Sequence, residues 1–178
     1  MITKNFIQYN NLLLQRLLNI PGAGVKALLP VTNTQNQACF LANGSASTSS
    51  YYNLVLNSTN SGVSVGSGTT PPTINDYNLE STITSGLSAA TPVVSTQLDE
   101  NGNPYVKLVY TINNISQNSI TISEIGAKIQ IFAATTQGAS ATSSLIFLLD
   151  RTLLDSPVTI PAGEYAVIEY VLKTVIPT

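Results

Sequence analysis

Alternation of polar and apolar residues in the C-terminal half of the chain limits the possible folds more than any other feature. Residues 105–112 alternate in this way, and so do residues 119–125. A period of two turns one set of side chains toward a core and the other toward solvent, as in a β-strand. The apolar set of the first segment is Val106, Leu108, Tyr110 and Ile112. Full burial would contribute about 1.5–3 kcal/mol for each, so these segments define the expected core.

Other short segments have strand character and are separated by residues typical of turns. They are residues 37–42, 51–56, 62–65, 91–98, 128–133, 144–149, 158–160 and 164–173. Asp99–Pro104 and residues 161–163 predict turns, and Gly126 predicts a turn or bulge. Both faces of segment 164–173 are fairly apolar, which predicts a mid-sheet strand or one covered by a partner chain. Short strands at this spacing predict an all-β fold, an antiparallel two-sheet β-sandwich of the jelly-roll or Ig-like kind.

One segment near the N-terminus has helical periodicity instead. Apolar residues recur at intervals of three and four over residues 4–20, and Pro21-Gly22 would end the helix. Its apolar stripe needs a cover; the stripe consists of Leu13, Leu14, Leu17 and Leu18. The stripe either packs against the chain's own β domain or forms an arm that docks on another subunit.

We therefore divide the chain into an N-terminal helix, arm and connector at residues 1–30 and a β-sandwich domain at residues 31–178. Pro21–Gly24 is a plausible hinge between them, and we predict that the arm docks on a neighbouring subunit. On this interpretation, removal of residues 1–21 leaves the β domain folded, with its thermal transition little changed.

Charged residues are scarce, and this limits the expected partners. They make up 9% of the chain against about a quarter in typical domains, and the net charge is −2. Such a surface suits a protein that neighbours cover, so we expect a homo-oligomer. The scattered basic residues give no footprint for nucleic acid or anionic lipid. No apolar run approaches a membrane span and no export signal is visible, so we expect synthesis in a cytoplasm and no membrane partner.

Residues for chemistry are also scarce. The chain has no histidine, which removes His-dependent triads and zinc sites, and its one cysteine, Cys39, lies in an apolar run. The nine carboxylates show no catalytic pairing, and we expect Glu124 to be a solvent-side or turn-bonding carboxylate. We therefore predict no enzymatic activity, no cofactor and no metal.

Two segments imitate ligand-binding loops. Asp99, Asn101 and Asn103 have the spacing of the first calcium ligands, but Tyr110 occupies the position of the bidentate Glu, so a hairpin turn is the better interpretation. The glycines of residues 66–70 lack the lysine of a phosphate loop. We expect residues 66–80 to form an ordered loop anchored on the core by Tyr77 and Leu79.

Three segments together resemble a known class of protein. They are residues 65–80 (VGSGTTPPTINDYNLE), residues 120–126 (ITISEIG), and residues 148–152 (LLDRT) with residues 157–164 (PVTIPAGE). In this order they are similar to segments of small structural proteins of tailed bacteriophages, although Ala127-Lys128 departs from that pattern. The resemblance implies a non-enzymatic component of the virion, in its head, neck or tail, made in the host cytoplasm. Its partners would be itself and other virion proteins. The alternative is a bacterial surface adhesin, a pilin-like protein or a carbohydrate-binding β-sandwich module.

Overall fold

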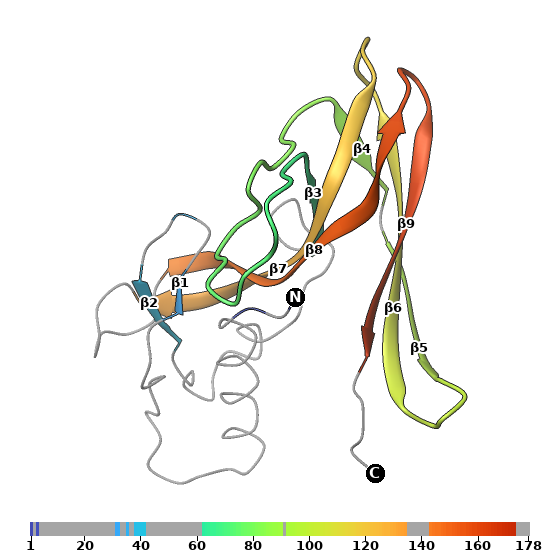
Figure 1. The fold of residues 1–178 in the computed structure, drawn as a ribbon. Helices are drawn as coiled ribbons and strands as arrows, with labels where there is room; N and C mark the ends of the chain where they lie inside the picture. Colours follow the sequence, from blue (N-terminus) through green and yellow to red (C-terminus); the bar gives the residue numbers. More distant parts are fainter. Residues whose placement is uncertain are drawn as a thin grey trace, which may run out of the picture. The chain divides into compact units, whose positions relative to one another are not determined.

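The computed structural model describes residues 1, 3, 31–32, 35, 38–41, 62–90, 92–134 and 143–173. These residues form an all-β protein whose strands pair antiparallel, and none of them is helical (Figure 1). The strands are β1 (Val31–Thr32), β2 (Ala38–Leu41), β3 (Gly62–Gly66), β4 (Leu87–Ala89), β5 (Val93–Leu98), β6 (Pro104–Asn114), β7 (Ile120–Ala134), β8 (Ser143–Ile160) and β9 (Tyr165–Lys173). Within the described ranges, no helix could span a membrane.

The strands belong to two sheets, which confirms the prediction of an all-β, antiparallel fold with two sheets. One sheet has the order β1-β2-β7-β3, and β8 also pairs with β7. The other has the order β4-β6-β5, and β9 also pairs with β6. The predicted helix at residues 4–20 lies outside the described residues, together with Leu13, Leu14, Leu17 and Leu18. The predicted strand at residues 51–56 lies outside them as well.

The chain divides into two compact units, which are described separately. Unit 1 consists of residues 1–82 and 123–156, and unit 2 consists of residues 83–122 and 157–178. Two of the unit boundaries fall inside strands. Strand β7 crosses from unit 2 to unit 1 after residue 122, and β8 crosses from unit 1 to unit 2 after residue 156.

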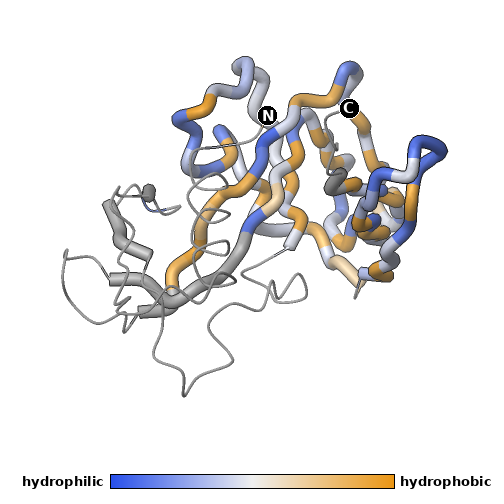
Figure 2. Tube along the Cα trace, turned by 90° about the horizontal axis from the view of Figure 1, so that it is seen from below, coloured by the Kyte–Doolittle hydropathy of each residue, from blue (hydrophilic) through white to orange (hydrophobic). Residues whose placement is uncertain are grey.

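Unit 2 is organised around β6. Strand β9 pairs with residues 105–113 of β6, and β5 and β4 pair with successive parts of β6. As the alternation predicts, one face of β6 is buried: Leu108, Tyr110 and Ile112 are at most 5% exposed. Ile122, Ile160 and Ile168 complete this core. In Figure 2, hydrophobic residues are frequent along the extended segments, and hydrophilic residues lie at several turns.

Unit 1 has its own core, and here two predictions were wrong. Its buried apolar residues are Val65, Leu79, Ala127, Phe147, Leu148 and Leu149. Leu79 thus anchors the loop as predicted, whereas Tyr77, the other predicted anchor, is only half-buried and lines an open pocket. However, Gly126 lies inside β7 and makes no turn. A glycine is needed at this position for packing instead, since a Cβ there would lie 2.7 Å from Leu79 Cδ2. The predicted strands 144–149 and 158–160 are likewise parts of one strand, β8.

The described N-terminal residues pair with β8. The Thr3 N–H donates to the Leu149 carbonyl over 3.0 Å, and the Arg151 N–H donates to the Met1 carbonyl over 3.1 Å. Thr3 is fully buried, and its hydroxyl donates to the Leu148 carbonyl over 2.7 Å. These two residues of the predicted arm are therefore part of unit 1.

The segment that imitates a calcium loop is the predicted hairpin turn. Asp99 Oδ1 accepts hydrogen bonds from the N–H groups of Asn101 and Asn103, at 2.9 and 2.8 Å. Gly102 has φ of +75°, a left-handed conformation that glycine adopts without strain. The turn thereby joins β5 to β6 and fixes their register.

Candidate functional site

Glu124 lies in β7, and its side chain is fully buried in unit 1. Its Oε1 accepts hydrogen bonds from the N–H groups of Gly68 (3.2 Å) and Ser81 (2.8 Å). Its Oε2 accepts from the Glu80 N–H (3.2 Å) and from Arg151 Nε (2.7 Å). The expected solvent-side position of Glu124 was therefore wrong, whereas its bonding to a loop was predicted correctly.

Two glycines make room for this carboxylate. A Cβ on Gly66 would lie 2.4 Å from Glu124 Oε1 and 2.6 Å from the Ser81 carbonyl oxygen. A Cβ on Gly68 would lie 2.5 Å from Glu80 Cβ. All three distances are far shorter than van der Waals contact. The Gly-x-Gly pattern therefore serves close packing of the loop backbone over β7, which agrees with the absence of a phosphate-loop lysine.

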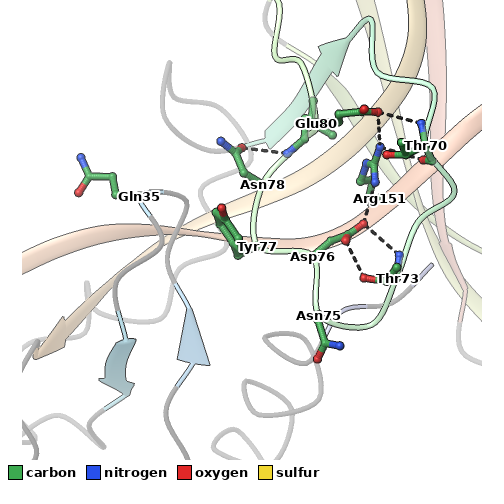
Figure 3. Close-up of a pocket in the computed structure, with 10 residues that line it drawn as sticks. Gln35, Thr70, Thr73, Asn75, Asp76, Tyr77, Asn78, Glu80 and Arg151 are labelled. Carbon is green, nitrogen blue, oxygen red and sulfur yellow. Dashed lines mark hydrogen bonds and ion pairs between the residues drawn. The ribbon is translucent and has the colours of Figure 1, made fainter.

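Arg151, on β8, is the cation at the centre of this site, and its side chain is 3% exposed. Besides its bond to Glu124, Nη1 lies 2.8 Å from Asp76 Oδ2. Nη2 donates to the Thr70 carbonyl over 3.1 Å and lies 3.4 Å from Glu80 Oε2. We call Arg151, Asp76, Glu80 and Glu124 the Arg151 cluster. Figure 3 shows the contacts of Arg151 with Asp76, Glu80 and Thr70. One guanidinium thus faces three carboxylates, a formal charge of −2.

The acidic members also fold the loop onto itself. Glu80 Oε2 accepts from the N–H groups of Thr69 and Thr70, at 2.7 and 2.8 Å. Asp76 accepts from the Thr73 N–H over 3.0 Å and from the Thr73 hydroxyl over 2.7 Å. Pro71-Pro72 has no N–H to contribute between these contacts. The loop of residues 67–81 is therefore held at both ends and in the middle by side chains of the Arg151 cluster.

Contacts within the cluster hold all three carboxyls in their charged form. Burial alone would raise the pKa of Glu124, but hydrogen bonds from Ser81 and Arg151 lower it. Burial would likewise raise the pKa of Asp76, but hydrogen bonds from Arg151 and Thr73 lower it. The pKa of Glu80 is lowered mainly by its hydrogen bonds with Thr70. Such carboxyls are poor proton donors near neutral pH, because they are almost entirely ionised.

The two cations of this region respond in opposite ways. Burial alone would lower the pKa of Arg151, but its hydrogen bonds with Asp76 and Glu124 raise it. Lys128, which is 9% exposed, has a lowered pKa because burial disfavours its charge, and Glu124 offsets this only in part. Arg151 is therefore the permanent countercharge of the cluster.

An open pocket of about 580 Å³ lies beside the cluster. Thr70, Asp76, Glu80 and Arg151 border it on one side, and its remaining lining includes Gln35, Asn75, Tyr77 and Asn78 (Figure 3). Among the described residues, no group of three or more Asp, Glu, Cys or His side chains is placed to hold a metal ion. The arrangement immobilises a loop and presents a polar, partly aromatic surface beside it.

The cluster was not predicted as a unit, although its members lie in the segments that carry the phage resemblance. Residues 65–80 supply Asp76 and Glu80, residues 120–126 supply Glu124, and residues 148–152 supply Arg151. A sequence signal for burial existed: Glu124 shares its strand face with Ile120 and Ile122, the apolar set of that segment. No family model, curated protein or solved structure matches this chain.

Proposed function

We propose that this chain is a non-enzymatic structural component of a tailed-phage virion, an accessory or decoration protein of the head, neck or tail. It acts by packing against copies of itself and other virion proteins. One observation carries the proposal: the three segments that resemble phage structural proteins, far apart in sequence, meet in the Arg151 cluster. A resemblance produced by chance composition would have no reason to converge on one set of contacts.

The chemistry of the cluster supports a structural role. Its carboxylates are bonded to Arg151 and to backbone N–H groups, and their lowered pKa values disfavour acid catalysis. The low charge of the chain supports a surface that neighbours cover. We further propose that the two sheets pack face to face as a sandwich of the jelly-roll or Ig-like kind, since β6 of unit 2 and β7 of unit 1 each bury apolar side chains. A crystal structure with the sheets joined edge to edge would refute this packing.

The experiment is to purify particles of the phage whose genome encodes this chain, by two successive density gradients, and to quantify the protein by mass spectrometry. We expect its peptides at a constant ratio to the most abundant particle protein across the gradient peak. A chain that stays in the soluble fraction of the lysate, with none in the peak, would contradict the proposal.

The pocket beside the cluster favours a second candidate, a carbohydrate-binding module of a bacterial surface protein. Tyr77 offers a ring for stacking on a sugar, and Asn75 offers an amide for hydrogen bonds to hydroxyls. Binding of the protein to a glycan array, lost in Tyr77→Ala and retained in Tyr105→Ala, would favour this candidate. Tyr105 is a suitable control because it lies on β6, in the other unit.

A further inference from the structure

The pocket beside the Arg151 cluster has more negative than positive charge at its border. Its charged lining residues are Asp76, Glu80 and Arg151, two carboxylates against one guanidinium, a net charge of −1. The side chains of Asp76 and Glu80 are 17% and 37% exposed, whereas the side chain of Arg151 is 3% exposed. A molecule that enters the pocket from solvent therefore meets the carboxylates before it meets the guanidinium.

The charges behind the pocket do not neutralise this excess. Arg151 is shared among Asp76, Glu80 and the buried Glu124. Lys128 is a second cation near Glu124, so three carboxylates and two cations leave a net charge of −1. All three carboxyls have lowered pKa values, and the excess therefore persists near neutral pH. A site with this charge attracts positively charged ligands.

The size and the lining of the pocket fit an organic cation better than a bare metal ion. Its volume of about 580 Å³ lies in the range of pockets that hold small organic ligands. A metal ion would instead need several oxygen ligands at about 2.0–2.6 Å. In the part of the chain that the structure describes, no three acidic, Cys or His side chains are grouped to provide them.

Tyr77 adds an aromatic ring to the carboxylates. It is half-buried, lines the pocket and follows Asp76 in the loop (Figure 3). The face of such a ring attracts ammonium and guanidinium groups. Asp76 and Glu80 both contact the guanidinium of Arg151, so the two carboxylates are close enough to be reached by one small ligand.

We propose that this pocket binds an organic cation, a guanidinium or primary ammonium group on an aliphatic stem, through the carboxylates of Asp76 and Glu80 and the ring of Tyr77. A basic side chain of a partner protein and a small free amine share this chemistry. The proposal goes beyond the packing role and does not depend on it.

The test is a nuclear magnetic resonance titration of the ¹⁵N-labelled full chain with N-acetyl-arginine amide and with N-acetyl-lysine amide. We expect saturable shifts, largest within residues 69–81, and a dissociation constant of about 0.1–1 mM, usual for ligands of this size. N-acetyl-citrulline amide has nearly the same shape as the arginine compound but no charge, and it should bind at least about 10-fold more weakly. Raising the salt from about 20 to about 200 mM should weaken binding of both cations.

Two variants test the residues. Glu80→Gln removes one charge but keeps an oxygen that can accept the hydrogen bonds of the loop N–H groups, and it should weaken binding at least about fivefold. Tyr77→Leu keeps an apolar side chain but removes the ring, and it should weaken binding at least about threefold. Glu100→Gln and Tyr105→Leu are the matched controls in unit 2, and both should bind within about 1.5-fold of the unaltered chain.

Three outcomes would overturn the proposal: no saturable shift with about 20 mM of either cation, a citrulline compound that binds within about twofold of the arginine compound, or largest shifts outside residues 69–81. The citrulline comparison uses the unaltered chain, so it holds even if a variant fails to fold. Binding of methyl glucoside as tight as that of the cations would also overturn it and would favour the carbohydrate-binding candidate.

A diamine separates the two sources of the cation. Tighter binding of the arginine or lysine compound than of putrescine assigns the pocket to a basic side chain of a partner protein. Tighter binding of putrescine assigns it to a free amine, and either result supports the cation site. The virion role is judged separately: a chain present in purified particles that binds no cation would reject the pocket proposal alone, and a chain that binds cations but is absent from particles would reject the virion role alone.

Discussion

Replacing Glu124 with Gln should destabilise unit 1 strongly, although the two side chains have the same shape. The carboxylate accepts four hydrogen bonds, two on each oxygen. Gln keeps one accepting oxygen and presents an NH₂ group to the other two donors. Each unsatisfied buried donor costs about 1–3 kcal/mol, and removal of one partner from a buried ion pair costs about 3–5 kcal/mol.

We therefore expect Glu124→Gln to lower the free energy of unfolding by about 3–5 kcal/mol, a large part of the total of about 5–15 kcal/mol. For a chain of this length the thermal midpoint should fall by about 6–20 °C. Urea unfolding followed by circular dichroism measures the loss, with Glu100→Gln as the control, because Glu100 is exposed in the β5–β6 turn. Hydrogen exchange should show lost protection of the Gly68 and Ser81 amides.

The outcome that contradicts this reasoning is a loss below about 1 kcal/mol, the range of exposed pairs, with protection of those amides intact. It would mean that the hydrogen bonds to Glu124 contribute little to holding the loop. A double-mutant cycle with Arg151→Met separates the pair from its surroundings: we expect a coupling energy above about 1 kcal/mol for residues in one buried network.

Three further predictions concern the loop and the N-terminal segment. Because the folded-state pKa values of Asp76 and Glu124 are lowered, the stabilisation from these carboxylates is fully present above their unfolded pKa values of 3.8 and 4.5. It is lost as pH falls from those values through the lower folded-state pKa values, so a urea midpoint that is flat from pH 7 to about 5.5 should decline below about pH 4.5. A midpoint that stays flat to pH 3 would contradict this. Gly68→Ala should cost at least about 2 kcal/mol through overpacking, and Gly102→Ala only about 1 kcal/mol, because nothing lies within 4 Å of its added Cβ and only its left-handed φ resists the change; equal losses in thermal unfolding would refute the packing argument. Deletion of residues 5–21, which keeps Met1 and Thr3, should preserve the β-type circular dichroism spectrum and abolish incorporation into particles; a truncated chain that fails to fold would assign the helix to the domain's own core.

The strands could be predicted from the sequence because alternation is a local signal. Residues 105–112 and 164–173 both became strands, and residues 105–112 have the expected buried face. The apolar character of both faces of residues 164–173 predicted a mid-sheet or partner-covered strand, but among the described residues β9 pairs with β6 alone. Gly126 was misjudged because its local signal, a glycine after a strand, is the same for a turn and for a close contact. Its true neighbour, Leu79, lies far away in the sequence.

The Arg151 cluster could not be predicted because its contacts are all long-range. Arg151 reaches Glu124 across 27 residues and Asp76 across 75, and no periodicity encodes such distances. Glu124 lies on the same strand face as Ile122, which indicates that it is buried but does not identify its partner. A buried carboxylate requires a cation. The chain has 7 Lys and Arg residues, so few cations could pair with Glu124, but the sequence does not indicate which of them does.

The interleaving of the two units has a consequence for synthesis on the ribosome. The chain passes from unit 1 to unit 2, back to unit 1 and again to unit 2, so neither unit is one continuous stretch. Gly68 emerges 56 residues before Glu124, and Asp76 emerges 75 residues before Arg151. At about 5–20 residues per second these partners are missing for several seconds. Strand β6 is likewise synthesised before β9, the strand with which it pairs. A nascent chain that stops before Arg151 should therefore contain neither unit in folded form. A finished chain whose C-terminal residues are still held inside the ribosome exit should likewise fold both units only after release.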